Sequence, residues 1–418
     1  MSRHMSFERL HNFRDLGGYP TAGGHVVRWG RLFRSDSLGK LGGADWDRFL
    51  DLGVTTVIDL RHPAEIDAKG RAPEHPTLAY HNLSIEHRPY DQPSQGPEVE
   101  PGPYLAAHYL EVAEDGVKEL RQALDLIAAP DTGPVVFHCA SGKDRTGQLA
   151  ALILALLGVP DDVIIEDFAL TELAADRLLA DWTADNGGVA PRWPAYCHAP
   201  ADVMRIFLTA MADTYGSVQA YAAEQLGVDA ELVAALRRNL LEPPLVFRRA
   251  GEADVPVLVG LRDAAARWQI ARGIDQWQPG ELGEDHFRAR LADGEVWIAT
   301  LGPGGPVAGA WELWWQDPAA WGTRPGAAGY VHRLMTARDT APPGTGRRLL
   351  AEAERRVAEA GLELCRLDCL AGNAVLRTYY RAAGYEVVGE QSAKSGARGT
   401  TYAVTLLEKR LAPVTIAA

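Results

Sequence analysis

The stretch GPVVFHCASGKDRTGQLAALILALLG (133–158) constrains the fold of this chain more than any other. It starts with PVVF (134–137), a short apolar run typical of a buried strand, and ends with QLAALILALLG (148–158), the pattern of a buried helix. Between them lie ten mostly polar residues, HCASGKDRTG (138–147). A strand that passes through one sharp turn into a buried helix is a building unit of an α/β fold.

The rest of the first half alternates in the same way. TTVIDL (55–60) is a second buried strand pattern, and helical patterns occupy residues 44–52, 104–128, 145–157, 161–180 and 201–223. The alternation predicts a central parallel or mixed sheet with helices on its faces. Ligands of such sheets bind outside the carboxyl ends of the strands, where Asp59 and Cys139 fall. Residues 87–103 are rich in Pro and Gly, which predicts a long mobile loop that could serve as a lid.

A domain boundary is expected near 241–245. An amphipathic helix pattern that begins at Glu231 meets Pro243 and Pro244, which cannot continue a helix, and a new strand pattern follows. We therefore expect two domains, 1–241 and 245–412, each long enough to bury its own core.

Composition excludes several classes of partner and location. The net charge of −13 argues against nucleic-acid binding. Four cysteines are too few for a disulfide framework, which indicates a reducing, cytoplasmic environment. The longest apolar run, LAALILALLGV, is too short to span a bilayer, so no transmembrane segment is expected.

The turn at 138–147 has the properties of a phosphate site. A turn that enters a helix directs several backbone N–H groups at one point, and the helix dipole adds positive potential there. We expect the backbone of Ala140, Ser141 and Gly142 to bind a phosphate, with Gly142 allowing a close approach or a positive φ. The turn does not match the nucleotide-binding pattern GxxxxGK[ST].

Three side chains of the turn complete this chemistry. A helix N-terminus and a nearby cation favour the thiolate of Cys139, which is a competent nucleophile. Arg145 lies six residues later, and its planar fork matches two phosphoryl oxygens. Thr146 is expected to donate a hydrogen bond to the cysteine sulfur when that sulfur becomes a leaving group.

His138-Cys139 followed by Arg145-Thr146-Gly147 resembles the signature of the cysteine-based tyrosine and dual-specificity phosphatases. NFRDLGGY (12–19), GRLFRSDSL (30–38), TVIDLRHPAE (56–65) and the turn itself resemble, in this order, a bacterial family of tyrosine and lipid phosphatases. The resemblance covers about residues 1–240 and implies the cysteine-phosphatase fold, a central sheet flanked by helices.

The resemblance implies a two-step reaction. Cys139 forms a phosphocysteine while a carboxylic acid protonates the leaving oxygen, and water then hydrolyses the intermediate. Asp144 is the favoured acid, and Asp59 is either an alternative acid, a substrate-binding residue or a structural partner of Arg145. Three other charged residues are expected to be architectural rather than catalytic: Arg14, Asp15 and Arg61.

Lys143 bears on the substrate. A second cation beside Arg145 favours a more highly charged ligand, as in phosphoinositide phosphatases, and the alternative is a solvated surface lysine. Phosphotyrosine, phosphoserine or phosphothreonine in proteins, and phosphoinositides all remain open as substrates.

The second half carries a different ordered set of patterns. A strand (329–337) precedes a Gly-containing turn and helix (341–361), a second strand (364–370), and a helix that runs into a final strand (372–390). Together they resemble the GNAT family of acetyl-CoA-dependent N-acetyltransferases over about residues 245–410, which implies an α+β fold. Acetyl-CoA is then the expected co-substrate, and a small amine or a protein amine the acceptor.

The CoA-binding positions follow from this resemblance. The pyrophosphate loop maps to 341–346, with Gly344 and Gly346 in place. The usual Gln or Arg is Ala341 and two prolines remove N–H donors, although Arg347 or Arg348 could restore a contact. Asn373 matches the asparagine near the pantetheine arm. Tyr380 matches the general-acid tyrosine, with a packed core tyrosine as the alternative.

The remaining candidates of the second half are weaker. Glu312 is a candidate general base. Cys365 and Cys369 share a strand face and are expected to be buried thiols rather than zinc ligands, so no metal is expected. Five tryptophans could line an acceptor pocket or pack in the core: Trp268, Trp277, Trp311, Trp314 and Trp315.

Three hypotheses follow. The first is a bifunctional enzyme, a cysteine phosphatase fused to an N-acetyltransferase. The second keeps the phosphatase and makes the GNAT half a non-catalytic acyl-CoA sensor, which the altered pyrophosphate loop favours. The third is a binding protein for phosphorylated partners, which the complete Cys139, Asp144 and Arg145 set argues against.

Overall fold

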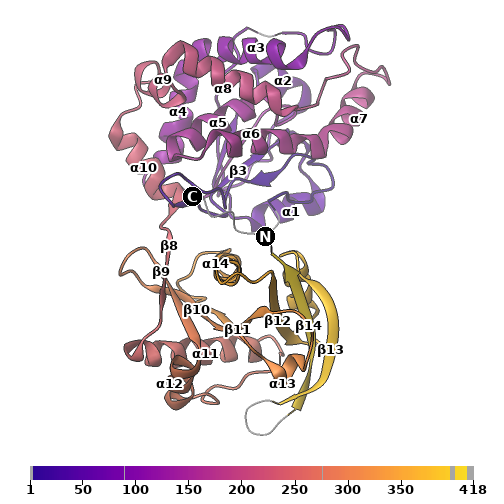
Figure 1. Ribbon diagram of the computed structural model, residues 1–418. Helices are drawn as coiled ribbons and strands as arrows, with labels where there is room; N and C mark the ends of the chain where they lie inside the picture. Colours follow the sequence, from indigo (N-terminus) through magenta and orange to yellow (C-terminus); the bar gives the residue numbers. More distant parts are fainter. Residues whose placement is uncertain (1–2, 89, 275, 396–400, 412–418) are drawn as a thin grey trace. The chain divides into compact units, whose positions relative to one another are not determined.

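The computed structural model describes residues 3–88, 90–274, 276–395 and 401–411. Contacts between residues divide the chain into two compact units, Met1–Glu242 and Pro243–Ala418 (Figure 1). Each unit contains its own sheet and its own apolar cores, as folded domains generally do.

The larger sheet of the first unit has five strands in the order β1-β3-β6-β4-β5. Their bounds are β1 (Arg14–Asp15), β3 (Leu32–Ser35), β4 (Thr56–Asp59), β5 (Ala79–Asn82) and β6 (Val135–His138). The strands β3, β6, β4 and β5 run parallel, and β1 is antiparallel to β3. The two predicted strands are confirmed as β4 and β6, and β6 lies at the centre.

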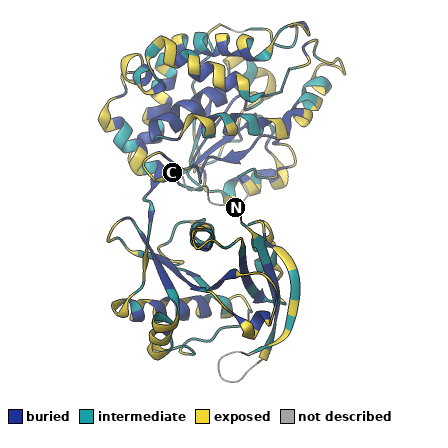
Figure 2. Ribbon diagram, viewed as in Figure 1, coloured by how far each residue is buried: buried dark blue, intermediate teal, exposed yellow. Residues whose placement is uncertain are grey.

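Alternating side chains of these strands supply two cores. Val135 and Phe137 of β6 belong to a large cluster with seven helices, while Val136 of the same strand belongs to a smaller cluster with Phe49 of α1 (Gly43–Asp51). The seven helices are α3 (Pro101–Asp115), α4 (Val117–Ala128), α5 (Asp144–Leu157), α6 (Asp161–Ala169), α8 (Ala201–Tyr215), α9 (Val218–Glu224) and α10 (Ala230–Leu240). All residues of α5 are buried (Figure 2), as its apolar pattern predicts.

Several predicted helices are shorter than their patterns. The pattern 104–128 forms two helices, α3 and α4, separated at Gly116, where a Cβ atom would lie 2.6 Å from the carbonyl oxygen of Ile85. α3 begins at Pro101, inside the stretch 87–103 that was predicted to be loop, because proline is well suited to the first turn of a helix. The pattern 161–180 divides into α6, a 3₁₀ turn (Leu170–Ala174) and α7 (Ala175–Asp185).

A short two-stranded sheet joins the start and the end of the first unit. β2 (Val26–Val27) pairs with β7 (Leu241–Glu242), and Arg28 Nε donates to the Leu241 carbonyl at 2.8 Å, across 213 positions of the chain. The unit is complete only when both strands are present.

The second unit contains a seven-stranded sheet in the order β13-β14-β12-β11-β10-β9-β8. The bounds are β8 (Leu245–Arg249), β9 (Glu295–Leu301), β10 (Val307–Trp314), β11 (Ala328–Thr336), β12 (Leu364–Leu370), β13 (Glu386–Ser395) and β14 (Thr401–Arg410). β11 and β12 are parallel, and the other described pairs are antiparallel.

Helices cover both faces of this sheet. Trp297 and Ala299 of β9 pack in one cluster with α14 (Thr345–Glu359), and Val296 and Ile298 pack in another with α11 (Val255–Ile270) and α12 (Glu284–Asp293). The short helices α2 (Pro63–Lys69), α13 (Pro318–Trp321) and α15 (Ala374–Arg381) complete the set used below. The predicted classes, a helix-flanked sheet in the first unit and an α+β fold in the second, are confirmed.

Within the described part of the chain, every helix lacks either the length or the apolar character that crossing a membrane would require.

Candidate active site

The predicted phosphate turn lies at the carboxyl end of the central strand of the first unit. Cys139 directly follows β6, and α5 begins five residues later at Asp144. Gly142 has a φ of +69°, and a Cβ atom there would lie 2.4 Å from the Ser35 carbonyl oxygen. Glycine is therefore required at 142 both for the backbone conformation and for space.

The carbonyl oxygens of the turn face the surrounding scaffold. The donors are Ser37 N for Ala140 at 3.0 Å, Asn12 Nδ2 for Ser141 at 2.9 Å and Arg34 Nη2 for Gly142 at 2.8 Å. In a trans peptide the following N–H points opposite to the carbonyl. The N–H groups of residues 141–143 therefore face away from the scaffold, which is the arrangement of an anion-binding loop.

A buried ion network fixes this scaffold. Asp167 of α6 accepts from Arg14 Nε at 3.1 Å, from Arg34 Nη1 at 2.6 Å and from the Tyr19 hydroxyl at 2.8 Å. Arg14, Arg34 and Asp167 are each at most 1% exposed. Burial would raise the pKa of Asp167, but the two arginines hold it far below its usual range. The same burial lowers the pKa of Arg34 to about 10.

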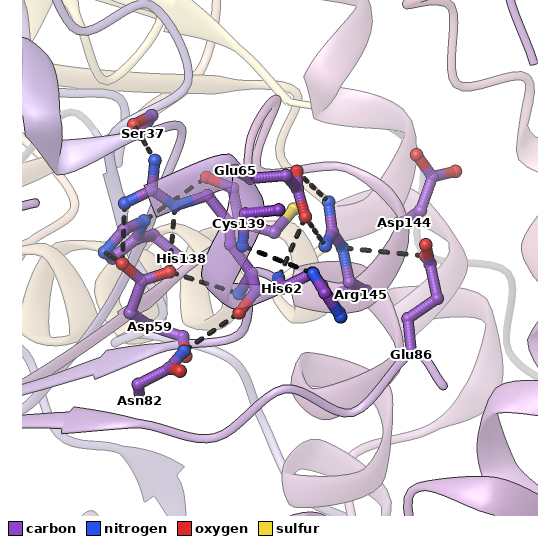
Figure 3. A network of polar contacts seen from close by, with 12 residues as sticks. Ser37, Asp59, His62, Glu65, Asn82, Glu86, His138, Cys139, Asp144 and Arg145 are labelled. Atoms are coloured by element: carbon purple, nitrogen blue, oxygen red, sulfur yellow. Dashed lines mark hydrogen bonds and ion pairs between the residues drawn. The ribbon is translucent and has the colours of Figure 1, made fainter. Parts of the chain in front are cut away.

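Arg145 lies between two carboxylates, Glu65 of α2 and Glu86 (Figure 3). Its Nη1 and Nη2 donate to Glu65 at 2.5 and 2.9 Å, and its Nε lies 3.7 Å from Glu86 Oε2. That Nε is buried and has no hydrogen-bond partner among the described residues. Arg145 is thus held in position by Glu65 and keeps one N–H available for a phosphoryl oxygen.

The two carboxylates have opposite pKa shifts. Burial would raise the pKa of Glu65, but the hydrogen bonds and charge of Arg145 bring it below its ordinary value. Burial raises the pKa of Glu86, and the nearby Asp144 and Glu65 charges act in the same direction against Arg145. Glu65 is therefore the firm partner of the guanidinium and Glu86 the one that takes up a proton more readily.

Cys139 lies at the base of the turn and is 1% exposed. Burial would lower the pKa of Arg145. Its hydrogen bonds to Glu65 and the nearby sulfur of Cys139 instead raise that pKa above its usual value. Thr146 is fully buried, and its Oγ1 has no partner among the described residues. The bond from Thr146 to the sulfur that was expected in the leaving-group step is thus not formed in this state.

Asp144 and Lys143 contact the segments that surround the entrance. Asp144 accepts from the Tyr109 hydroxyl at 2.6 Å and from Gln92 Nε2 at 3.3 Å. Lys143 is 1% exposed, and its Nζ lies 3.2 Å from the His198 carbonyl and 3.5 Å from Asp144 Oδ1. The alternative of a solvated surface lysine at 143 is wrong, because the ammonium is buried among polar partners.

Asp59 is placed differently from the expectation. It is fully buried, bonded to Arg61 at 2.6 and 2.9 Å and to the Tyr80 hydroxyl at 2.9 Å. Glu65, and not Asp59, is the partner of Arg145. Asp59 therefore supports the strand end beneath the turn and offers no exposed oxygen to a substrate. Arg14, Asp15 and Arg61 have structural contacts, as expected.

In the second unit, the predicted pyrophosphate turn opens α14. Gly344 has a φ of +89°, and a Cβ atom on Gly346 would lie 3.0 Å from the Tyr379 hydroxyl. Arg347 stacks over the Tyr379 ring at 5.0 Å. The N–H groups of Thr345 and Arg347 donate to Pro342 and Gly344, so fewer backbone donors are available here than the resemblance implies.

The other predicted acetyl-transfer residues lie on two elements. Asn373 caps α15, with its Oδ1 accepting from Leu376 N at 3.0 Å. Tyr380 packs against the core that includes Tyr385, and burial raises its pKa. Glu312 is 1% exposed and accepts from Arg333 at 2.6 Å and from Trp314 at 3.0 Å through Oε2.

Two further expectations concern thiols and metals. Cys365 and Cys369 are buried free thiols, and burial raises their pKa values to about 12 and about 11. One group among the described residues has metal-ligand geometry: Asp317, His332 and Asp368 have donor atoms within 4.8 Å of one another. Lys394 Nζ lies 2.5 Å from Asp368, so a cation already compensates this group.

Comparison with known proteins identifies the first unit. The model of the tyrosine phosphatase family matches residues 5–242, more than half of the chain. The chain belongs to this family. It is 32% identical over 254 residues to a Cupriavidus necator protein assigned to the tyrosine-protein phosphatases, covering 57% of this chain and 89% of the relative. It is 30% identical over 197 residues to the triple specificity protein phosphatase PtpB of Mycobacterium tuberculosis, covering 40% and 69%.

The second unit has a relative of its own. The chain is 29% identical over 147 residues to the uncharacterized N-acetyltransferase YesJ of Bacillus subtilis, covering 32% of this chain and 78% of YesJ.

Some residues of this phosphatase site were not singled out from the sequence. Glu65 could have been found, because HPAE places Pro at the first helical position and Glu two residues later, a helix-start signal directly after β4. Glu86 follows β5, whose sequence AYHN carries no strand pattern. Asp167 and Tyr109 lie within helices, and only the tertiary structure brings them to the turn.

Proposed function

We propose that this chain is a bifunctional enzyme. Its first unit hydrolyses phosphomonoesters through a phosphocysteine, and its second unit transfers an acetyl group from acetyl-CoA to an amine. The observation that carries the phosphatase part is the bonding of the carbonyls of 140–142 to the scaffold, which directs the N–H groups of 141–143 away from it beside buried Cys139, together with the unpartnered Nε of Arg145.

The phosphatase reaction uses the turn as follows. The backbone N–H groups and Arg145 bind the phosphoryl oxygens, and the sulfur of Cys139 attacks phosphorus. The P–S bond forms as the P–O bond to the leaving group breaks, and Asp144 gives its proton to the leaving oxygen. Water then attacks phosphorus, Asp144 takes the proton of that water, and the thiolate is released with phosphate.

Asp144 is the proposed acid because of its surroundings. It lies next to Arg145 in the first turn of α5 and holds its carboxylate with the Tyr109 hydroxyl at 2.6 Å. Figure 3 shows it on the same side of the turn as Glu86. Of the two carboxylates considered from the sequence, Asp59 is fully buried and bonded to Arg61 and Tyr80, whereas Asp144 keeps some exposed surface.

The proposed substrates are phosphotyrosine in proteins and, in addition, phosphoserine, phosphothreonine or phosphoinositides. A broad range is supported by the relative whose name states triple specificity. A second cation, Lys143, lies within 3.5 Å of Asp144 and supports a more highly charged substrate. The four free cysteines support a reducing, cytoplasmic location.

The acetyltransferase part rests on the sequence resemblance and the similarity to YesJ. The CoA pyrophosphate would lie at the start of α14, beside Gly344, Gly346 and Arg347, and the pantetheine arm near Asn373. Glycine suits position 346 because a Cβ atom there would lie 3.0 Å from the Tyr379 hydroxyl. Acetyl-CoA would supply the acetyl thioester. Glu312 would accept a proton from the acceptor amine, and Tyr380 would hold the proton that the leaving sulfur needs. A non-catalytic acyl-CoA sensor is the second candidate, which the bonded N–H groups of Thr345 and Arg347 favour.

One experiment tests the phosphatase part. Phosphate release is measured for wild type, Cys139→Ser and Asp144→Asn on a phosphotyrosyl peptide, a phosphoseryl peptide and phosphoinositide vesicles, together with phenyl phosphate and p-nitrophenyl phosphate. Cys139→Ser should be inactive throughout. Asp144→Asn should lose about 10²- to 10⁴-fold on phenyl phosphate and much less on p-nitrophenyl phosphate, whose leaving group needs no proton. Equal losses on the two aryl phosphates would remove Asp144 from the acid role.

A second experiment tests the acetyltransferase part. Release of CoA thiol is followed with a panel of amines, alongside direct binding of acetyl-CoA to the full chain. Binding with turnover supports the enzyme, and binding without turnover supports the sensor.

A further inference from the structure

Arg262 of α11 is a buried cation with unused hydrogen-bond donors. It is 3% exposed, its Nη2 donates to Glu281 Oε2 at 2.8 Å, and its guanidinium lies over the Trp277 ring at 4.0 Å. Its Nε and Nη1 have no hydrogen-bond partner among the described residues. Buried polar groups are nearly always bonded, because leaving them unpaired costs stability. The planar edge of this guanidinium therefore has the properties of an anion site.

The surroundings of Arg262 are rich in positive charge. Burial lowers the pKa of His286 in α12, and the charges of Arg333, Arg290 and Arg262 lower it too, against the single opposing charge of Glu312. His286 Nε2 and Arg290 Nε are also buried and without hydrogen-bond partners in the described part of the chain. Arg262 lies on α11, His286 and Arg290 on α12 and Arg333 on β11, and the carboxylates Glu281 and Glu312 do not pair all of their buried nitrogens.

Glu312 adds the opposite chemistry beside this cluster. Arg333 Nη1 and Trp314 Nε1 both bond to its Oε2, while Oε1 is buried and unpartnered among the residues described. Arg333 lies where the pairing of β10 with β11 shifts register, and it has a φ of +46°, which is unusual for an arginine. Such strained positions cluster at functional sites. One unit thus holds a buried, unpaired carboxylate oxygen together with buried, unpaired cationic donors.

We propose that the second unit binds an amine that also carries a carboxylate, with Arg262 receiving the carboxylate and Glu312 receiving the amino group. This inference rests on the proposed acetyltransferase function and narrows its acceptor to the amino-acid class. Trp277 lies against the guanidinium of Arg262 and Trp314 donates to Glu312, and aromatic rings beside both residues favour an acceptor with an apolar side chain.

In the proposed reaction, the amine nitrogen forms a bond to the thioester carbonyl carbon and the carbon–sulfur bond breaks. The nitrogen loses its proton to Glu312, and the sulfur leaves as the thiolate that takes up a proton. No oxidant, reductant or metal is needed.

The test compares matched acceptors on the full chain. The α-amino acids, β-alanine and γ-aminobutyrate are screened by CoA thiol release, and the best one is compared with its carboxamide and its decarboxylated amine. The carboxamide has a less basic amino group and the decarboxylated amine a more basic one, so a preference for the carboxylate over both cannot arise from amine basicity. We expect the two neutral partners to be at least about tenfold poorer in kcat/KM.

Variants locate the carboxylate site. Arg262→Met should reduce kcat/KM for the amino acid by about 10- to 100-fold and leave its carboxamide unchanged, while Arg262→Lys should recover part of the loss. Phosphate release by the first unit serves as the control and should not change. The comparison of acceptors uses wild type alone, so it holds even if a variant at 262 fails to fold.

The outcomes separate the two proposals. Equal acetylation of the amino acid and its neutral partners overturns this inference and leaves the acetyltransferase standing. If no amine is acetylated, isothermal titration with the amino acids decides. If wild type binds an amino acid and Arg262→Met does not, the inference is supported although the transfer function fails. If wild type binds no amino acid, the inference is overturned as well.

Discussion

Asp167→Asn is the substitution that tests most directly how the phosphate turn is supported. Asp167 is the single carboxylate between two fully buried guanidiniums, those of Arg14 and Arg34. The substitution keeps the shape of the side chain and removes its charge. Its amide can still accept from one arginine, but its NH₂ group then faces the other.

The expected cost follows from this geometry. Removing one partner of a buried ion pair leaves an uncompensated charge and costs about 3–5 kcal/mol. For a unit of this size, each kcal/mol lowers Tm by about 2–4 °C, so a fall of roughly 6–20 °C is expected. Arg34 also holds the Gly142 carbonyl at 2.8 Å, so the turn loosens and kcat/KM should fall by about tenfold or more.

The effect should depend on pH with a definite sign. The pKa of Asp167 is lowered in the folded chain, so the unfolded chain binds the proton more tightly. The stabilisation by Asp167 is therefore complete above the ordinary aspartate pKa, about 3.9, and is lost as pH falls toward the folded value. The difference in Tm between wild type and Asp167→Asn should be constant from pH 5 to 8 and should shrink below about pH 4.

Scanning calorimetry of the full chain measures the difference, and loss of phosphate release on heating assigns the transition to the first unit. Asp202→Asn is the matched control, because Asp202 pairs with Arg205 at the surface with side chains 72% and 56% exposed. Its effect should stay within about 0.5 kcal/mol. A shift for Asp167→Asn no larger than the control, or a shift that does not change with pH, would refute the reasoning.

Three other substitutions test the turn itself. Glu65→Gln leaves only one oxygen for Arg145, so kcat should fall by about tenfold. Tm should fall less than for Asp167→Asn, because Glu86 remains beside the guanidinium; full activity in steady-state assays would exclude Glu65 as a positioning residue. Gly142→Ala places a Cβ atom 2.4 Å from the Ser35 carbonyl at a positive φ, so it should abolish phosphate release and cost about 1–3 kcal/mol in a thermal melt; an active variant contradicts the geometry. Burial raises the pKa of Glu86, so ionising Glu86 costs folding stability as pH rises above about 4.3. Glu86→Gln should therefore be more stable than wild type at pH 7 but not at pH 4. Thermal melts at both pH values test this prediction.

The central strands and the turn of the first unit were predictable because they are apolar and short. β4 and β6 bury alternating side chains in two cores, which requires runs of Val, Ile and Phe. β5 was not predicted, since AYHN at the sheet edge contains one apolar aromatic residue and two polar ones. The break between α3 and α4 escaped detection because apolar periodicity continues through Gly116, and the reason for the break is the Ile85 carbonyl.

The placement of some residues of the candidate site could likewise be predicted from the sequence, and the contacts of others could not. Cys139, Asp144 and Arg145 lie in one continuous turn, where order along the chain determines order in space. Asp59 was correctly placed at a strand end, but its side-chain contacts with Arg61 and Tyr80 are tertiary and cannot be derived from position alone. The catalytic roles of Cys139, Asp144 and Arg145 remain predictions.

The burial of Arg262 could not be predicted from the sequence, for a related reason. It is one of two arginines in VPVLVGLRDAAARWQI, and an arginine in a largely apolar helix is expected to reach the surface. Burial instead depends on Trp277 and Glu281, which the following loop places over it.

The pairing of β2 with β7 has a consequence for how this protein is made. On a ribosome the residues of β2 emerge early, and their partner is synthesised after every helix of the first unit. Until then β2 presents an open edge, the kind of surface on which nascent chains associate with one another. The first unit thus reaches its finished state only when translation has passed Glu242 and is already producing the second. A nascent chain arrested at α10 would hold a nearly complete first unit whose strand β2 still lacks its partner.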